Sequence, residues 1–117
     1  MTHEINEVLK ALVENKMMIH DDHNGSEYEA QMILLQIFKN GNSRICLGFK
    51  KSYTPYFSVN PLYVDKETGK VHLNRASSGG VVDYANVDNE EEGIKKYNKE
   101  HEKEFGMHDK LTIINLK

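Results

Sequence analysis

The spacing of apolar residues changes from a helical repeat to a strand repeat after the first quarter of the chain, and this change restricts the possible folds most. Apolar residues within 3–18 recur every three or four positions, which is typical of an amphipathic helix. From Tyr28 the repeat becomes two, which is typical of β-strands. The strand-like segments follow one another without helical segments between them. This order indicates an α+β layer and not a doubly wound parallel sheet.

The same patterns predict the individual elements. Strands are predicted at 31–39, 43–51, 56–64, 70–74 and 81–87, followed by a helix over 88–105 and a strand over 111–116. Segment 31–39 carries apolar residues on both faces, so we expect it to be a central strand. Pro61 cannot donate to a ladder and indicates an edge or a bulge.

Turn signals separate these segments. Residues 20–26 are polar and contain Asn24-Gly25, which predicts a loop or a short hairpin tip, and residues 40–42 and 65–69 predict two hairpin turns. Asp88 followed by Glu91 has the spacing of a capping box at the start of the second helix.

Together these patterns predict one α+β domain over residues 1–117. It has an N-terminal helix, an antiparallel sheet of about five strands built from hairpins, a C-terminal helix and a final strand. We expect a single layer of helices on the sheet.

The lengths of the apolar runs and the single cysteine bear on the cellular location. No run reaches the ~18 apolar residues of a spanning helix, and the first twenty residues are acidic and amphipathic, unlike a secretion signal. We therefore expect a cytoplasmic protein without a membrane segment. Cys46 is the only cysteine, which excludes an internal disulfide, and its sequence context predicts a small, partly buried strand residue and not a reactive thiol.

The charges are sorted along the chain. Residues 1–29 hold seven acids and two bases, residues 30–82 hold seven bases and two acids, and residues 83–117 hold nine acids and six bases. A basic middle between acidic ends favours an anionic ligand or a charged partner. If the acidic helices cover one face of the sheet, the electropositive surface should include Arg44, Lys50, Lys51 and Arg75.

Lysine and asparagine are abundant, with thirteen Lys against two Arg and eleven Asn. This bias is typical of AT-rich genomes, and it suggests a low-GC bacterium or one of its phages as the source.

The densest group of potential metal ligands is His20-Asp21-Asp22-His23. Imidazole and carboxylate groups suit zinc, manganese or iron. A metal site usually needs a further ligand from elsewhere, however, and the spacing nominates none among Glu27, His72 and His108. We therefore interpret the segment as a solvated turn and predict no bound metal and no cofactor.

Two segments could contact a ligand or a partner. In the segment 75–80, two glycines could form an anion-binding nest beside two serines and Arg75, although a plain hairpin loop fits the same pattern. In the segment 50–57, two lysines alternate with three aromatic residues, which could stack on bases, contact a protein or fill the core. The candidate binding residues are Arg44, Lys50, Lys51, Tyr53, Tyr56, Arg75, Ser77, Ser78, Gly79 and Gly80.

No catalytic set can be assembled from spacing alone. His72 and Arg75 with a carboxylate such as Glu29 could act as an acid–base group in a small nuclease, but we expect His72 to be an exposed strand residue on the face opposite Val71 and Leu73. No catalytic residue is therefore predicted, and the chain is expected not to be an enzyme.

Our first hypothesis is a non-enzymatic binding protein, an inhibitor, anti-defence or immunity protein of phage or bacterial type that acts by stoichiometric contact with a macromolecule. The alternative is a protein that sequesters a nucleotide or another phosphate ligand. A small nuclease is a weaker alternative. A protein partner is favoured over nucleic acid, an anionic small ligand such as a nucleotide and a homo-oligomer both stay open, and no membrane partner is expected.

Overall fold

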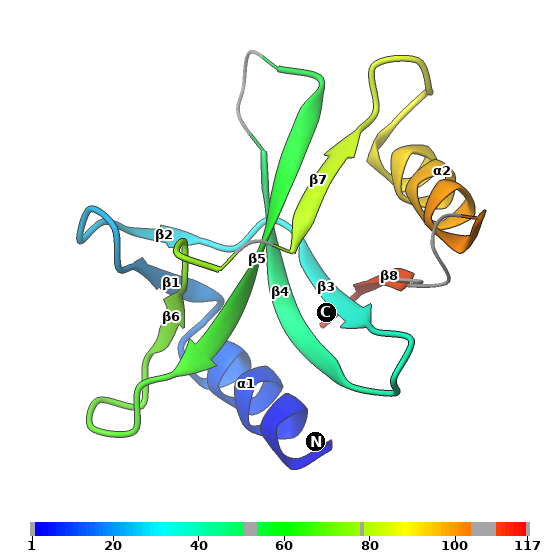
Figure 1. The fold of residues 1–117 in the computed structure, drawn as a ribbon. Helices are drawn as coiled ribbons and strands as arrows, with labels where there is room; N and C mark the ends of the chain where they lie inside the picture. Colours follow the sequence, from blue (N-terminus) through cyan, green and yellow to red (C-terminus); the bar gives the residue numbers. More distant parts are fainter. Residues whose placement is uncertain (1, 51–53, 78, 104–109, 117) are drawn as a thin grey trace.

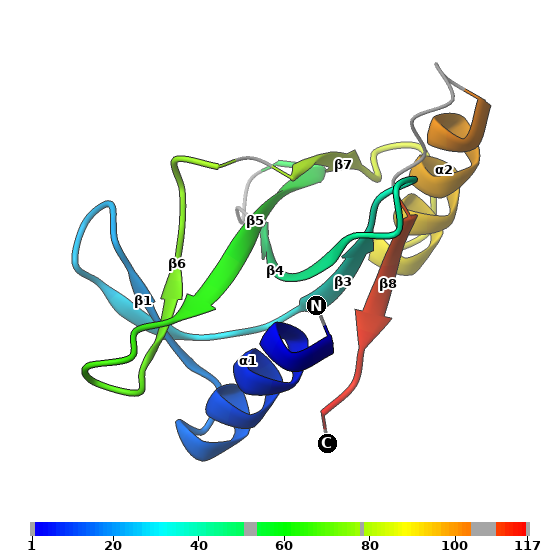
Figure 2. The same cartoon turned by 60° about the horizontal axis from the view of Figure 1, so that its bottom comes forward.

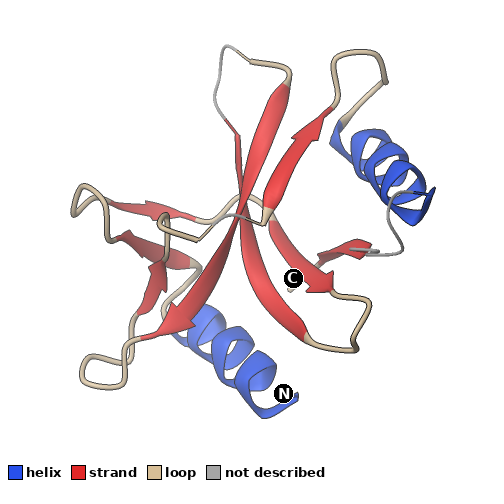
Figure 3. Cartoon of the chain, viewed as in Figure 1, coloured by secondary structure: helices blue, strands red, loops and turns tan. Residues whose placement is uncertain are grey.

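Two helices and eight strands make up the computed structural model, which describes residues 2–50, 54–77, 79–103 and 110–116 (Figures 1 and 3). In chain order the elements are α1 (Thr2–Glu14), β1 (Met18–Asp21), β2 (Glu27–Glu29), β3 (Ile33–Ile37), β4 (Ser43–Lys50), β5 (Tyr56–Val64), β6 (Val71–Leu73), β7 (Gly80–Asp83), α2 (Glu90–Lys103) and β8 (Lys110–Ile114). The predicted α+β class, the helix near each end of the chain and the final strand are confirmed. In the described part of the chain, neither helix is long and apolar enough to cross a membrane.

The strands form one sheet in the order β2-β1-β6-β5-β4-β3-β8, and β7 also pairs with β5. Strand β5 has β4 along one edge, and its other edge pairs first with β7 and then with β6 (Figure 1). Pro61, which cannot donate a ladder hydrogen bond, lies where the pairing changes from β7 to β6. All pairings are antiparallel except that of β1 with β6.

Two hydrophobic cores lie on opposite faces of the central strands. Ile33, Ile45 and Leu47 pack with α1 in the first core, whereas the alternating residues Leu34 and Cys46 pack with α2 in the second. Because successive side chains of a strand point to opposite faces, this division confirms that segment 31–39 is buried on both sides. The helices lie at separate places along the sheet (Figure 2).

This arrangement corrects three details of the prediction. The sheet is mixed and has more strands than expected, because the segment around residues 20–26 forms the hairpin β1–β2 and β1 adds in parallel to β6. The helices do not form a single layer, because each covers a different face. The first helix ends at Glu14 and not at residue 18, because Lys16 and Met17 adopt positive φ angles of 55° and 65° and reverse the chain.

Asn89, and not Asp88, caps the second helix. Its side-chain oxygen accepts a hydrogen bond from the N–H of Glu92 at 3.0 Å. The first turn then carries Glu90, Glu91 and Glu92, whose negative charge is favourable at a helix N-terminus.

An asparagine connects α2 to the edge strand β8. The side chain of Asn98 donates to the carbonyl of Leu111 at 3.0 Å and accepts from its N–H at 2.8 Å, so it replaces a neighbouring strand at this position. Leu111 is 1% exposed, so its backbone N–H and carbonyl would be buried without a hydrogen bond if Asn98 were absent. Since α2 also contacts β7, the helix joins two edge strands of the sheet.

Replacing Asn98 with Ala should lower the free energy of unfolding by about 1–3 kcal/mol, because the N–H and carbonyl of Leu111 lose their partner. Urea unfolding followed by circular dichroism measures the change. Lys99→Ala, at an exposed position of the same helix, is the matched control and should be nearly neutral. An equal effect of both variants would contradict the role given to Asn98.

Candidate functional site

Four side chains form a row across the outer face of four neighbouring strands. His20 on β1 lies opposite Glu27 on β2 and opposite His72 on β6, and His72 in turn lies opposite Tyr63 on β5. Their neighbours Ile19, Val71 and Leu73 point to the other face and are buried in the first core, as the alternation of strand residues requires. The row therefore faces away from the core. The prediction that His72 points away from Val71 and Leu73 is confirmed, but its side chain is only 16% exposed and not exposed as expected, because Asp22 and Tyr63 pack around it.

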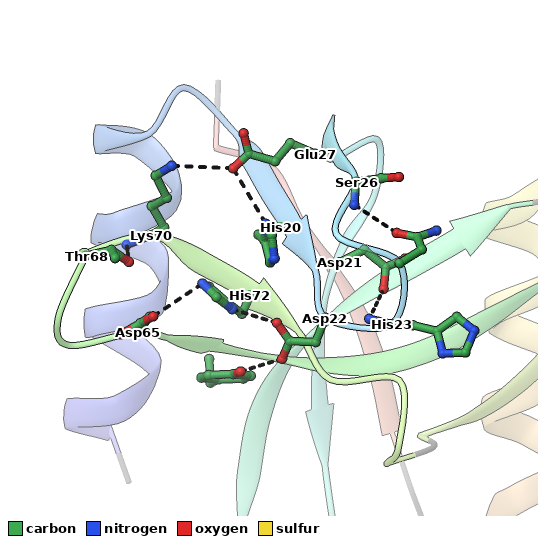
Figure 4. A network of polar contacts seen from close by, with 12 residues as sticks. His20, Asp21, Asp22, His23, Ser26, Glu27, Asp65, Thr68, Lys70 and His72 are labelled. Carbon is green, nitrogen blue, oxygen red and sulfur yellow. Dashed lines mark hydrogen bonds and ion pairs between the residues drawn. The ribbon is translucent and has the colours of Figure 1, made fainter.

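Two aspartates from adjoining turns complete this histidine cluster (Figure 4). Asp22, directly after β1, accepts a hydrogen bond from the hydroxyl of Tyr63 and lies 2.7 Å from Nδ1 of His72 through its other oxygen. Asp65, directly after β5, lies 3.6 Å from Nε2 of His72. The rings of His20 and His72 have centroids 4.7 Å apart.

The electrostatics of the cluster centre on Asp22. Partial burial acts to raise the pKa of this carboxyl, but hydrogen bonds from Tyr63 and His72 and the charges of the two histidines outweigh it and lower the pKa. The hydrogen bond to Asp22 raises the pKa of Tyr63 to about 12, with burial adding to the effect. Asp22 is thus held as an ionised acceptor between two donors.

Chemically, the cluster offers the donor atoms of a metal site. One ring nitrogen of His20, one of His72 and one carboxylate oxygen of Asp22 lie within 4.8 Å of one another. The sequence spacing favoured none of Glu27, His72 and His108 as the further ligand to the segment 20–23, and the structure brings His72 to this position. The structure separates that segment, because Asp21 points into the protein and His23 is exposed on the turn.

Asp21 belongs to a second site, on the opposite face of β1. Its carboxylate is fully buried, accepts from Nε of Arg75 at 2.9 Å and accepts from the N–H of His23 at 3.0 Å. The guanidinium of Arg75 also lies over the ring of Phe49, 4.8 Å from its centroid. Arg75 is therefore fixed from two sides at the edge of the first core.

The Arg75 cavity, of about 360 Å³, opens beside this ion pair. Its polar lining includes Arg75, Tyr28 and Lys50, and Phe49 forms part of its apolar wall. The buried hydroxyl of Tyr28 makes no hydrogen bond of ordinary geometry to a described residue, but it lies beside the guanidinium of Arg75. Burial raises the pKa of Tyr28 and the charge of Asp21 adds to this rise, whereas the charge of Arg75 and its hydrogen-bonding contact with the phenol oppose it. The remaining lining residues are Asp21, Asn24, Ser26, Glu29, Gln31, Leu47 and Gly48.

The loop predicted as an anion nest is held against the sheet. The N–H of Gly79 donates to the carbonyl of Val59 at 2.6 Å, and its carbonyl accepts from the side chain of Gln36 at 2.8 Å. The carbonyl of Ser77 accepts from the side chain of Asn60. Gly79 and Gly80 permit close packing, because an added Cβ would lie 2.9 Å from Val59 in one case and 2.9 Å from Tyr97 in the other. Ser78 lies outside the described residues.

The other candidate residues are dispersed. Arg44 donates to Gln36 and lies over the ring of Phe38, on the face of the second core, so it is not beside Arg75. Lys50 forms an ion pair of 2.5 Å with Glu90, and Tyr56 is 43% exposed. Lys51 and Tyr53 lie outside the described residues. The structure brings Lys50 and Arg75 to one cavity but does not gather the four basic residues into one patch.

Cys46 is fully buried in the second core, as expected for a strand residue. Burial raises the pKa of its thiol to about 11, which keeps it protonated and unreactive at neutral pH.

Sequence analysis missed Tyr28, Phe49 and Tyr63 as site residues. Tyr28 and Phe49 looked like ordinary strand aromatics, and their meeting with Arg75 depends on the pairing of β1 with β6. Tyr63 becomes a member of the cluster only through its register with His72. Strand alternation is the one sequence signal that points to these residues, because it predicts that His72 and Tyr63 face away from Val71 and Leu62.

Comparisons with protein-family models, with curated proteins and with solved structures gave no significant match. The geometry of the two sites is therefore the basis for the functional argument.

Replacing Asp22 with Asn should lower the pKa of Tyr63 from about 12 toward its ordinary value of 10.0, because the carboxylate that favours the neutral phenol is lost. The pKa is measured by alkaline titration of tyrosinate absorbance in the wild type and in Asp22→Asn. Subtracting the titration of the same protein with Tyr63→Phe leaves the signal of the Tyr63 phenol. The stabilisation linked to the raised pKa should be present below pH 10.0 and lost as the pH rises through about 12. A Tyr63 phenol that titrates near its ordinary value in both proteins would refute the bond.

Proposed function

We propose that this protein is a non-catalytic binding protein whose Arg75 cavity takes a small ligand with a phosphate group, such as a nucleotide. The observation that carries the proposal is the guanidinium of Arg75, which lines the cavity and is held by Asp21 and Phe49. The buried hydroxyl of Tyr28 lies beside it and makes no hydrogen bond of ordinary geometry to a described residue. A ligand oxygen bound by the guanidinium would also accept from this hydroxyl once the ring shifts toward the cavity.

The setting of Arg75 supports an anionic acceptor. Asp21 holds its Nε, and Phe49 lies against the guanidinium plane, so the side chain is ordered before any ligand arrives. A guanidinium carries five N–H donors in a fork that matches phosphate oxygens. Only the Nε donor is used in the bond to Asp21, so the terminal nitrogens provide the ligand contacts. Asp21 balances the charge of Arg75, which lowers the cost of keeping the cation half-buried.

The size and the walls of the cavity support a ligand larger than inorganic phosphate. A volume of about 360 Å³ lies within the range of small-molecule sites, which starts near ~300 Å³. Leu47, Phe49 and Tyr28 offer apolar surface suited to a base or another ring. Lys50 also lines the cavity, with its ammonium paired to Glu90.

A second candidate function is stoichiometric binding to a protein, as an inhibitor or immunity protein would do. Tyr56 and Val81 are 43% and 55% exposed. They are diagonal neighbours on the same face of the β5–β7 pair, because Ser58 pairs with Val81 and Tyr56 with Asp83. Exposed tyrosine beside an apolar residue is typical of the anchors of protein interfaces.

The ligand proposal is tested with a thermal-shift panel of nucleotides, pyrophosphate and inorganic phosphate. A ligand at ~100 times its dissociation constant should add about 2.7 kcal/mol to the free energy of unfolding. Tyr28→Phe should weaken binding roughly 10- to 100-fold, because a hydrogen bond to a charged group is worth about 1.5–3 kcal/mol. Without ligand the same variant should be close to the wild type in stability, since the hydroxyl makes no hydrogen bond of ordinary geometry to a described residue.

Tyr56→Phe is the matched control and should bind the ligand as the wild type does. Arg75→Lys should also weaken binding, but it disturbs the buried pair with Asp21, and breaking such a pair costs about 3–5 kcal/mol of stability. Tyr28→Phe is therefore the decisive variant. A panel without any shift, or full binding by Tyr28→Phe, would refute the cavity as a phosphate-ligand site.

The protein-binding alternative predicts a different pattern. A Tyr56→Ala, Val81→Ser double variant should lose a partner that native mass spectrometry detects with the wild type, because two interface anchors are removed. Its melting temperature should stay close to that of the wild type, since both side chains are exposed. Retention of the partner by the double variant would exclude this face as the interface.

A further inference from the structure

We propose that His20, Asp22 and His72 bind a divalent transition-metal ion of the zinc type, at a site separate from the Arg75 cavity. Two imidazole nitrogens and a carboxylate oxygen are donors that suit zinc, and they lie within 4.8 Å of one another. Neighbouring ligand atoms around a tetrahedral zinc ion lie about 3.4 Å apart. Small side-chain rotations therefore convert the present arrangement into a coordination shell.

The backbone already sets the positions of these donors. His20 and His72 are direct partners in the parallel β1–β6 pair, and Asp22 follows β1 in the adjoining turn. The 2.7 Å hydrogen bond between Asp22 and Nδ1 of His72 holds a carboxylate oxygen beside an imidazole nitrogen, and an ion would replace the proton of this bond and move the two atoms apart. Within the network, the side chain of His72 is only 16% exposed, so the site is partly shielded from water.

Outer carboxylates lie near both histidines. Oε2 of Glu27 lies 3.8 Å from Nδ1 of His20, and Oδ2 of Asp65 lies 3.6 Å from Nε2 of His72 (Figure 4). A modest approach of each carboxylate would give the carboxylate–histidine–metal arrangement of zinc sites, and the second nitrogen of His72 is bonded to Asp22, which is itself one of the proposed ligands. Tyr63 holds the second oxygen of Asp22 and completes this outer layer. The ion would use the nitrogen of His20 that faces away from Glu27, together with Nδ1 of His72 and Asp22.

The local charge favours a cation. Asp22, Asp65 and Glu27 bring three carboxylates to the network, against the single ammonium of Lys70, which lies 3.6 Å from Glu27. With neutral imidazoles, the network is therefore negative. The two nitrogen donors select against magnesium and calcium, which prefer oxygen ligands.

The test is isothermal titration of the metal-stripped full chain with zinc near pH 7, with cobalt(II) as a spectroscopic probe of the coordination geometry. We expect one ion per chain and the visible absorption of tetrahedral cobalt. Loss of a residue that only supports a metal ligand lowers metal affinity roughly 10- to 100-fold. His72→Ala and His20→Ala each remove a ligand and should therefore lower zinc affinity by more than this.

His23→Ala is the matched control, because His23 is exposed on the same turn but lies outside the cluster. This variant should bind zinc like the wild type. Circular dichroism establishes that each variant is folded, and Asp22→Asn provides a third ligand variant should either histidine variant unfold. Failure of the folded wild type to bind zinc, equal binding of magnesium, or a loss in His23→Ala as large as that in His72→Ala would overturn the proposal. None of these results bears on ligand binding in the Arg75 cavity.

Discussion

Strand β5 pairs with three other strands, and this triple pairing determines where both candidate sites lie. Its first half pairs with β7 and its second half with β6, while β4 runs along the other edge. The pairing with β6 positions Tyr63 beside His72 and gives β1 an edge on which to add. The pairing with β7 begins at Gly80, and the N–H of the preceding residue, Gly79, donates to the carbonyl of Val59. These contacts hold the loop that follows Arg75 against β5. A shift of one residue in β5 would reverse which side chains face each core and would separate both sites.

Much of this fold could be predicted because its signals are local. The hairpins β3–β4 and β5–β6 follow from period-two segments joined by short turns with glycine at positive φ, at Gly41 and Gly69. The parallel pair β1–β6 could not be predicted in this way. It joins residues 19–21 to residues 71–73, both strands are very short, and no local pattern records which distant edge a short strand will join. Everything that depends on that contact, including the meeting of His20 with His72, was therefore outside the reach of the sequence.

The charge sorting along the sequence is partly neutralised by the fold. Lys50 and Arg75 come from the basic middle, and they pair with Glu90 and Asp21 from the acidic ends. Lys70 lies near Glu27 in the same way. The expectation of one electropositive surface assumed that neighbours in sequence stay neighbours in space. Long-range strand pairing instead brings opposite charges together, so the sorting describes which segments attract each other and not where an anionic partner binds.

The adjacent residues Asp21 and Asp22 connect the two sites through one short turn. Strand alternation sends Asp21 inward to Arg75 and leaves Asp22 outside with His72 and Tyr63. The inner carboxylate also accepts from the N–H of His23, so it fixes the backbone from which Asp22 projects. Removing Arg75 would leave Asp21 buried without its cation and would strain this turn. A variant of Arg75 therefore disturbs the histidine cluster as well as the cavity, whereas Tyr28→Phe removes one hydroxyl beside Arg75 and leaves the bonds of Asp21 to Arg75 and to the N–H of His23 in place.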